Sequence, residues 1–472
     1  MIHMKDAMTG IDRSFFAANA WIDGAWARDV LLRVDGDGRW CGVEVNSALP
    51  DRQNATVLGG PVLPGLVNAH SHAFQRAIAG LTERKGDSSG ALSDDFWSWR
   101  ERMYTVARRI TPAQLEAIAA LLYAELLAGG YTQVCEFHYL HNAVDGAPGV
   151  DPIDMSLALV RAAQRVGMGL TLLPTLYMRS GFAAQGLRED QARFAGTPDS
   201  VARLVEGLRR QTGNLANVNL GVAVHSLRAA DEFAIKEVAA FAAAAALPVH
   251  IHIAEQTQEV QDCIARTGQR PIEWLLQNLA LDARWNLVHA THTTAAELQA
   301  VRQRNASIVI CPSTEANLGD GIFDYSGYAR LGGSWSVGSD SHVSRGWTEE
   351  LRLLEYSQRL TQRKRNVAAQ TSRHASSAAT LYEAALAGGQ AATGQPLGAL
   401  AIGKRADFLV LDLQSSALLG VPIENTLDAL VFSSPDARFK EVFVAGNQRL
   451  ADSELWPRLA QDFVSTMKAL WS

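Results

Sequence analysis

Hydrophobic residues in the middle of the chain recur in two alternating patterns. Short apolar runs of strand length end in polar residues, and longer amphipathic stretches of helical length follow them. The short runs predict eight strands, at residues 62–72, 131–139, 169–177, 218–226, 247–255, 286–292, 307–313 and 335–342. Because strands that alternate with helices form parallel sheets, this pattern is typical of the α/β class and favours a (β/α)8 barrel of the TIM type.

One of the helices between these strands shows both of its ends in the sequence. Thr111 has the residue type of an N-terminal cap, and Pro112 fits the first helical turn. The pair Gly129-Gly130 follows the apolar stretch and predicts the end of the helix. We therefore expect a helix that begins after Thr111 and ends before Gly130.

Both chain ends have a different, strand-like pattern. Near the start, "AWIDGAW" places an Asp-Gly turn between apolar residues, and "LLRVDGDGRWCGVEV" predicts another strand, turn and strand. Near the end, "GKRADFLVLDL" and "FKEVFVAGNQRLAD" are two further strand signals. We predict a small β-sandwich domain formed by residues 1–62 and 398–472, the latter including a terminal helix, around a barrel at 63–397.

Composition and charge exclude several classes of partner. The chain has 472 residues, of which 47% are hydrophobic and 19% charged, and its formal net charge is −6, so we expect no nucleic-acid partner. The longest apolar stretch is interrupted by Pro248 and two histidines, so we expect no membrane span. The four cysteines form no CxxC pair and the start lacks an apolar leader, which favours a cytoplasmic location.

The first predicted barrel strand ends in a histidine pair, His70 and His72, within "NAHSH". Side chains at i and i+2 of a strand point to the same face, so the two imidazoles can converge on one ligand. By itself the pair fits a chance arrangement at a strand end as well as it fits half of a metal site.

Other predicted strands also end in groups that bind metals or transfer protons. Active sites of barrel enzymes lie at the C-terminal ends of the strands, so we expect one active site there. The residues concerned are Tyr139, His225, His252, Glu255, His289, His292, Asp340 and His342.

Four of these strand ends resemble motifs of the amidohydrolase superfamily. They are "NAHSH", "HIAE", "VHATH" and "VGSDSH", and "GKRADFLVLD" resembles a returning strand of the superfamily's β-sandwich domain. The resemblance covers nearly the whole chain and implies the metal ligands His70, His72, His252 and Asp340. Binuclear members usually carry a lysine or glutamate near the fourth strand, which "VNLGVAVHS" lacks, so the resemblance implies one divalent ion per chain. Zinc suits a set of three histidines and one aspartate, and iron(II) and manganese(II) stay open.

The same resemblance implies a hydrolytic mechanism. Asp340 acts as ligand and base toward a metal-activated water, and His289 orients and polarises that water. Glu255 carries a proton to the nitrogen of a C=N bond, so that ammonia can leave. Alternatively, Glu255 only holds His252 in place. We expect His292 and His342 to support the site without binding the metal.

Further motifs bear on the substrate. "AHSHAFQRAIAGL", "DFWSWRERMY", "EFHYLH" and "AVHSLRA" resemble the formimidoylglutamate deiminases of the superfamily, which implies hydrolysis of N-formimidoyl-L-glutamate to N-formyl-L-glutamate and ammonia in histidine degradation. A small dicarboxylate calls for guanidinium donors. The substrate-binding candidates are Gln75, Arg100, Tyr139, His225 and Arg228.

Three points stay open within this assignment. Gln75 and Arg76 cannot both face the pocket, and Gln75 is chosen by resemblance. Arg100 could instead cap its helix or form a salt bridge there. The loop at 86–95, rich in small residues, is either an active-site lid or slack.

Two other functions compete with this one. One is a related mononuclear deaminase or dechlorinase that acts on guanine, an adenosine derivative or a triazine, against which the two arginines argue. The other is a barrel relative that has lost catalysis and serves as a scaffold, which would bind no metal. Because relatives are often dimers, the resemblance also implies a homodimer.

Overall fold

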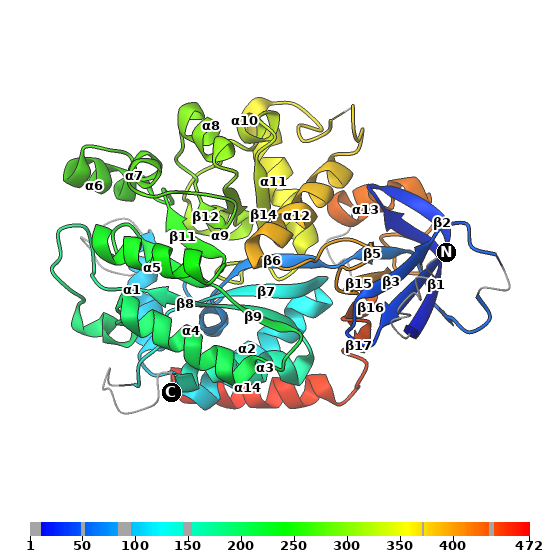
Figure 1. Ribbon diagram of the computed structural model, residues 1–472, viewed down its shortest axis with the longest axis horizontal. Coiled ribbons are helices and arrows are strands. Elements are labelled where there is room, and N and C mark those ends of the chain that lie inside the picture. The colour runs from blue at the N-terminus through cyan, green and yellow to red at the C-terminus, as the bar shows by residue number, and fades with distance from the viewer. Residues whose placement is uncertain (1–10, 49–51, 84–95, 145–152, 371, 434–438) are drawn as a thin grey trace, which may run out of the picture.

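The computed structural model describes residues 11–48, 52–83, 96–144, 153–370, 372–433 and 439–472 (Figure 1). The predicted loop at 86–95 lies outside these residues. Two sheets make up the described β-structure, one in the middle of the chain and one from the chain ends.

The first sheet is a parallel barrel, as the sequence predicts. Its strands are paired in the order β14-β13-β12-β11-β10-β8-β7-β6, with β9 beside β8. A parallel bridge between Ser71 and Asp340 joins the ends of β6 and β14 and so closes the ring. The strands are β6 (Leu66–Ser71), β7 (Tyr131–His138), β8 (Gly169–Leu176), β9 (Val218–Leu220), β10 (Val222–Ser226), β11 (Val249–Ile253), β12 (Trp285–His289), β13 (Ser307–Ile310) and β14 (Ser334–Val337). Each of the eight predicted strands overlaps at least one of these elements, and 218–226 covers both β9 and β10, so the barrel prediction is confirmed.

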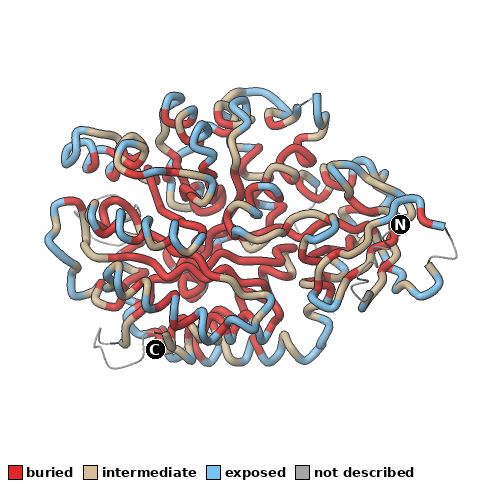
Figure 2. Tube along the Cα trace, in the orientation of Figure 1, coloured by how far each residue is buried: buried red, intermediate tan, exposed pale blue. Residues whose placement is uncertain are grey.

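Apolar sequence runs explain why these strands lie at the centre. Every residue of β7 and β8 is buried, and Figure 2 shows buried chain, in red, at the centre of the barrel. Strands that are covered on both faces need continuous apolar runs rather than alternation. Some polar side chains, such as Gln133 and Glu136, lie buried within the strands, and the candidate site forms where the strands end.

Helices surround the barrel strands (Figure 1). The predicted helix ends are confirmed, because Thr111 accepts a hydrogen bond from the backbone N–H of Gln114, and Gly129 is the C-terminal cap. The helices are α1 (Phe96–Ala107), α2 (Pro112–Ala128), α3 (Ile153–Val166), α4 (Pro198–Thr212), α5 (Glu232–Ala244), α6 (Thr257–Thr267), α7 (Pro271–Asn278), α8 (Ala295–Gln303), α9 (Pro312–Leu318), α10 (Tyr325–Arg330), α11 (Trp347–Gln362), α12 (Ser377–Thr393), α13 (Thr426–Phe432) and α14 (Leu455–Trp471), with 3-10 turns η2 (Ala73–Ala77), η3 (Glu189–Phe194) and η4 (Ile423–Asn425).

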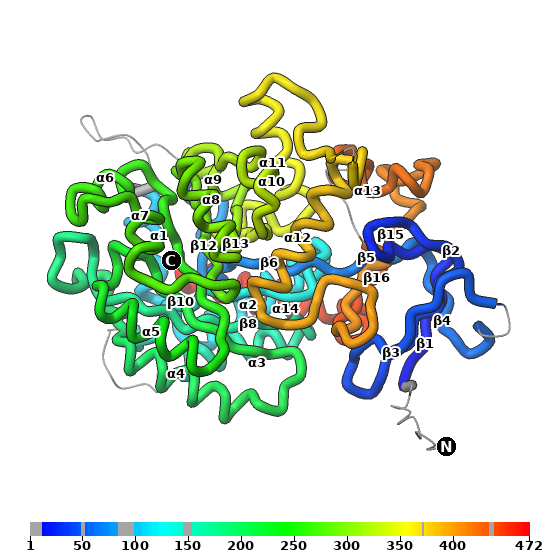
Figure 3. Tube along the Cα trace, turned by 45° about the horizontal axis from the view of Figure 1, so that its top comes forward, coloured from blue at the N-terminus to red at the C-terminus, as the bar shows by residue number. Residues whose placement is uncertain are grey.

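The second sheet joins the two chain ends, as predicted. Its order is β17-β16-β15-β5-β1-β2-β3, and Figure 3 shows the blue and orange strands side by side. The stacked rings of Phe408 and Phe443, with centroids 4.2 Å apart, lie in its own hydrophobic core. Its strands are β1 (Ile11–Ile22), β2 (Ala25–Asp35), β3 (Trp40–Glu44), β4 (Thr56–Val57), β5 (Val62–Pro64), β15 (Phe408–Leu411), β16 (Phe439–Val444) and β17 (Asn447–Arg449). The domain boundaries at 62/63 and 397/398 stay predictions.

The terminal helix α14 packs on the barrel, along α2 (Figure 1). The indole N–H of Trp471 donates to the carbonyl of Ala77 at 3.1 Å, and Arg109 donates to the carbonyl of Leu470 at 3.2 Å. Because Ala77 ends the 3-10 turn that follows His72, the chain terminus braces the segment next to the histidine pair. Within the described residues, no helix combines the length and the hydropathy that a membrane crossing needs.

Gly388 provides a test of how closely the barrel and its helices pack. A Cβ atom at this position of α12 would collide with the backbone carbonyl of Trp335 in β14. We expect Gly388→Ala to destabilise the protein by about 1–3 kcal/mol through overpacking and to lower its melting temperature by several degrees in calorimetry. Gly36→Ala is the control, because no atom lies within 4 Å of a Cβ added there. Equal melting temperatures for the two variants would contradict this packing.

Candidate metal centre and active site

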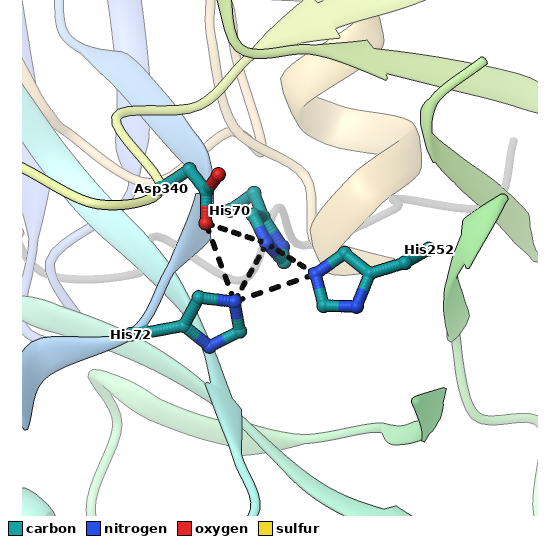
Figure 4. A group of neighbouring side chains, drawn as sticks. All are labelled: His70, His72, His252 and Asp340. Carbon is teal, nitrogen blue, oxygen red and sulfur yellow. Dashed lines mark hydrogen bonds and ion pairs between the residues drawn. The ribbon is translucent and has the colours of Figure 1, made fainter. Parts of the chain in front are cut away.

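Four side chains from three strand ends point toward one another (Figure 4). His70 and His72 come from the end of β6, His252 from β11, and Asp340 from the segment after β14. The Nε2 atoms of the three histidines lie 2.9–3.3 Å apart, and Asp340 Oδ1 lies 3.3 Å from Nε2 of both His70 and His72. The structure thus brings the four sequence-predicted ligands together, and all are buried.

The outer nitrogens of two histidines fix their protonation state. His72 Nδ1–H donates to the Phe137 carbonyl and His252 Nδ1–H donates to the His225 carbonyl, each at 2.9 Å. A ring that donates through Nδ1 keeps a lone pair on Nε2 for a ligand. Burial also lowers the pKa of all three ligand histidines, that of His70 to about 3, so the rings are neutral.

Asp340 supplies the negative charge of this group. Burial alone would raise the pKa of its carboxyl, but the hydrogen bond from His70 and the nearby histidines lower the pKa overall, so the carboxylate is ionised. Its backbone N–H donates to the His70 carbonyl at 3.0 Å, and the His72 N–H donates to the Asp340 carbonyl at 3.3 Å. These two hydrogen bonds hold β6 against the segment that carries Asp340.

Several residues at this end of the barrel have a left-handed backbone conformation. Ala254, His289, Asp340 and His342 all have positive φ angles, between +45° and +69°. The left-handed region is unfavourable for residues with a Cβ atom, and such strain occurs where the surrounding structure fixes a functional side chain. The strain is consistent with a site whose ligands are held in place before anything binds.

The donor set fits a single divalent ion. Three neutral imidazole nitrogens and one carboxylate oxygen form a buried group of net charge −1. Tetrahedral coordination at ~2.0–2.1 Å places neighbouring ligand atoms about 3.3 Å apart, close to the distances seen here. Each histidine turns Nε2 inward, which is the arrangement a metal requires.

Glu255 and His289 lie beside this group. His289 Nε2 is 3.7 Å from Glu255 Oε1 and 3.9 Å from Asp340 Oδ2. Burial raises the pKa of Glu255 to about 7. Burial opposes protonation of His289, but Glu255, Cys311 and Glu315 raise its pKa well above the usual value. Glu255 can therefore exchange a proton near neutral pH, while the raised pKa of His289 favours its protonated form.

The five predicted substrate-binding residues line one pocket with this machinery. Gln75, Arg100, Tyr139, His225 and Arg228 form its wall together with His72, His252, Glu255, His289 and Asp340. His70 is fully buried behind the wall. One pocket thus contains three of the four candidate ligands, the candidate proton carriers and two guanidinium groups.

The structure separates Gln75 from its neighbour Arg76. Gln75 lines the pocket and donates through Nε2 to the hydroxyl of Tyr139 at 3.3 Å. Arg76 turns away and forms a bidentate ion pair with Glu125, at 2.7 and 2.9 Å. The choice of Gln75 for the pocket therefore agrees with the geometry.

Comparison with known proteins places the chain in a family. A model of the amidohydrolase family matches residues 62–449. The chain belongs to the amidohydrolase family. This confirms the predicted superfamily, and the matched region contains every candidate site residue.

Relatives within the family include several deaminases. A formimidoylglutamate deiminase of Pseudomonas aeruginosa is 46% identical over 439 residues, 93% of this chain and 95% of that protein. An 8-oxoguanine deaminase of the same organism is 28% identical over 83% of this chain and 82% of its own length. Among solved structures, an amidohydrolase from Brucella melitensis is 40% identical with a TM-score of 0.90, over 98% of this chain and 100% of that one.

The two remaining strand-end histidines of this amidohydrolase lie outside the metal group. His292 Nε2 donates to the Asp320 carbonyl at 2.8 Å. His342 is buried against the hydroxyls of Ser71 and Ser339, at 3.4 and 3.0 Å. Neither histidine belongs to the group of four that could hold an ion, and their supporting role stays a prediction.

Sequence reasoning missed several residues of the site. Glu315 in α9 lies 3.3 Å from His289 Nδ1, and its position two residues after the predicted strand 307–313 could have indicated it. Tyr177 follows β8 directly, and Tyr104 lies one helical turn after Arg100, so both also had a sequence signal. The apolar wall residues have no signal that separates them from core residues; they are Trp99, Met103, Phe194 and Leu318.

Proposed function

We propose that this amidohydrolase hydrolyses N-formimidoyl-L-glutamate to N-formyl-L-glutamate and ammonia, as a cytoplasmic step of histidine degradation. The relative of Pseudomonas aeruginosa that is named formimidoylglutamate deiminase supports this assignment, because it aligns over 93% of the chain. The 8-oxoguanine deaminase, whose name indicates a heterocyclic substrate as in the alternative hypothesis, is more distant at 28% identity.

The observation that carries the proposal is the pair of buried guanidiniums in the pocket. Arg100 and Arg228 are 8% and 5% exposed, and both line the pocket that holds the metal group. Two guanidinium groups in one pocket supply planar, paired N–H donors, which bind carboxylates through two parallel hydrogen bonds. N-formimidoyl-L-glutamate carries two carboxylates, which match two fork-shaped donors, whereas guanine, adenosine derivatives and triazines carry none.

We further propose that His70, His72, His252 and Asp340 hold one zinc ion. A bound zinc ion lowers the pKa of a coordinated water toward neutrality and so supplies the nucleophile. Asp340 uses Oδ1 toward His70 and His72, which leaves Oδ2 to accept a proton. The homodimer stays a prediction.

The protein's own groups then move the protons that the reaction needs. Asp340 Oδ2 and His289 Nε2 lie 3.9 Å apart, so an attacking water between them can be oriented by His289 and deprotonated by Asp340. Glu255, with a pKa of about 7, can deliver a proton to the terminal nitrogen of the amidine. Gln75, Tyr139 and His225 donate toward the substrate, while the two arginines hold its carboxylates. The protonated nitrogen leaves as ammonia.

Metal removal tests the candidate ligand set. We expect the purified protein to contain about one metal ion per chain and to lose more than ~99% of its activity in a chelator, because activation of water depends on the ion. Zinc should restore the activity, and His252→Asn should lower both metal content and activity. Full activity of the metal-free protein would contradict the ligand assignment. Stronger activation by iron(II) or manganese(II) than by zinc would contradict the choice of zinc but not the ligand set.

A substrate panel tests the proposed reaction. We expect the zinc-loaded protein to release ammonia from N-formimidoyl-L-glutamate at least ~10³-fold faster than from guanine, adenosine or an aminotriazine, since a site built for paired polar groups rejects analogues without them. Coupled spectrophotometric detection of ammonia is the measurement. Release of ammonia from a heterocycle alone would overturn the proposed substrate. Absence of release from all four compounds would overturn the proposed deiminase activity.

A further inference from the structure

Two tyrosines of the pocket wall, Tyr104 and Tyr177, form a closed hydrogen-bonded group with Gln191. Their hydroxyls lie 3.2 Å apart, and Gln191 Nε2 lies 3.2 Å from the first and 3.0 Å from the second. All three residues are at most 3% exposed. Tyr104 comes from α1, Tyr177 follows β8, and Gln191 belongs to η3.

The orientation of the Gln191 amide is fixed independently of the tyrosines. Its Oε1 atom accepts a hydrogen bond from the backbone N–H of Arg188 at 3.1 Å, within a capping box at the start of η3. The Nε2 group must therefore face the tyrosines, and an amide nitrogen can only donate. Both of its protons go to the two phenol oxygens.

Counting protons shows that the group has a donor to spare. Each phenol has one proton, and each phenol oxygen already accepts one from Gln191. The hydrogen bond between the two hydroxyls uses one phenol proton, which leaves the other without an acceptor. Among the described residues, neither hydroxyl has a further hydrogen-bond partner. Leaving a buried hydroxyl without an acceptor costs free energy, so we expect a molecule bound in the pocket to supply the acceptor.

The surroundings of the pair indicate the charge of that acceptor. The guanidinium of Arg100 lies over the Tyr104 ring, 5.6 Å from its centroid, and the His225 ring stacks on Tyr177 at 4.3 Å. Burial raises the pKa of Tyr177 well above the usual value, while the charges of Arg228 and Arg100 act in the opposite direction, so this phenol lies near both arginines and stays protonated. An anionic oxygen held by the arginines is thus within the neighbourhood of the spare donor.

We propose that the Tyr104–Tyr177 pair, oriented by Gln191, donates one phenol hydrogen bond to a carboxylate of the substrate. The pair is a specificity determinant rather than a proton carrier, because no step of the proposed reaction uses it. The proposal deepens the proposed function. It rests on that function for the identity of the substrate that carries the carboxylate.

Binding of glutarate, a dicarboxylate without an amidine, tests this role without relying on catalysis. We expect the double variant Tyr104→Phe/Tyr177→Phe of the zinc-loaded protein to raise the Kd of glutarate about 10- to 100-fold in calorimetry, as for loss of a hydrogen bond to a charged group. At least one single variant should bind within a few-fold of the wild type, because removal of the phenol that donates within the pair leaves the spare donor in place.

Controls separate this role from a structural one. Tyr328→Phe removes another buried phenol, whose hydroxyl donates to the Ala306 carbonyl at 3.2 Å outside the pocket, and it should leave the Kd unchanged. Melting temperatures of all variants show whether packing is intact. Neutral glutaramide, which lacks the charge, should bind wild type and double variant alike.

Each outcome decides the proposal. An unchanged Kd for glutarate in the double variant, an equal loss for glutaramide, or failure of the wild-type protein to bind glutarate would overturn it. Selective loss of glutarate binding supports it. If the wild type binds glutarate in this tyrosine-dependent way but releases no ammonia from N-formimidoyl-L-glutamate, the proposed reaction fails while the carboxylate donor stands.

Discussion

Glu255→Gln is expected to lower kcat for ammonia release by about 10²- to 10⁴-fold, the range for loss of a general acid–base group. The substitution keeps the shape of the side chain and removes its ability to exchange a proton near neutral pH, where burial places its pKa. Because Glu255 is not among the four side chains proposed to hold the metal, the metal content and the Kd of glutarate should stay close to the wild-type values. Steady-state kinetics, metal analysis and calorimetry on the same preparation measure all three.

This variant separates the two roles that the sequence leaves open for Glu255. If the carboxylate only held His252, Glu255→Gln would lower metal content and activity together, and added zinc would restore both. Glu206→Gln, on the exposed face of α4, is the control for a change of charge alone. Wild-type kcat in Glu255→Gln would contradict its assignment as the proton donor to the leaving nitrogen.

Arg228→Ala is expected to lower kcat/KM for N-formimidoyl-L-glutamate by about 10²- to 10³-fold, mostly through KM. The residue is buried in the pocket wall. Truncating one partner of a buried, hydrogen-bonded charge pair costs about 2–5 kcal/mol or more, which corresponds to a decrease in kcat/KM of at least about 30-fold. Arg228→Lys should recover only part of the loss, because an ammonium lacks the planar fork that a carboxylate fits. Steady-state kinetics on both variants measure this.

Substrate analogues show whether the loss comes from a carboxylate contact. The two monoamides of N-formimidoyl-L-glutamate each lack one negative charge, and the variant should discriminate much less than the wild type between the substrate and one of them. Arg266→Ala, at an exposed position of α6, is the control and should behave like the wild type. An equal loss of activity on the substrate and both monoamides would show that Arg228 is structural.

The barrel and most of the candidate site could be predicted because their signals are local. A buried parallel strand needs an unbroken apolar run, so a histidine or acid at its end, such as His252 or Asp340, stands out in the sequence. Parallel strands that close a barrel bring their C-terminal ends together, so residues 182 positions apart, His70 and His252, meet at 2.9 Å. That convergence follows from topology alone.

The parts that could not be predicted depend on contacts between irregular segments. Gln75 and Arg76 differ only in which way the short turn η2 directs them, and the partner that draws Arg76 away, Glu125, lies on α2. The Tyr104–Tyr177–Gln191 group joins a helix, a strand end and a 3-10 turn. No periodicity in the sequence encodes such a meeting, since each residue alone fits a core position.

The fate of the formimidoyl carbon tests the central claim most directly. N-formimidoyl-L-glutamate labelled with ¹³C at that carbon is incubated with the zinc-loaded protein and followed by ¹³C NMR. Protonation of the terminal nitrogen by Glu255 predicts that the label appears in N-formyl-L-glutamate, with one equivalent of ammonia released. Appearance of the label in formamide, together with free glutamate, would mean that the other C–N bond breaks, and it would contradict both the reaction and the role of Glu255.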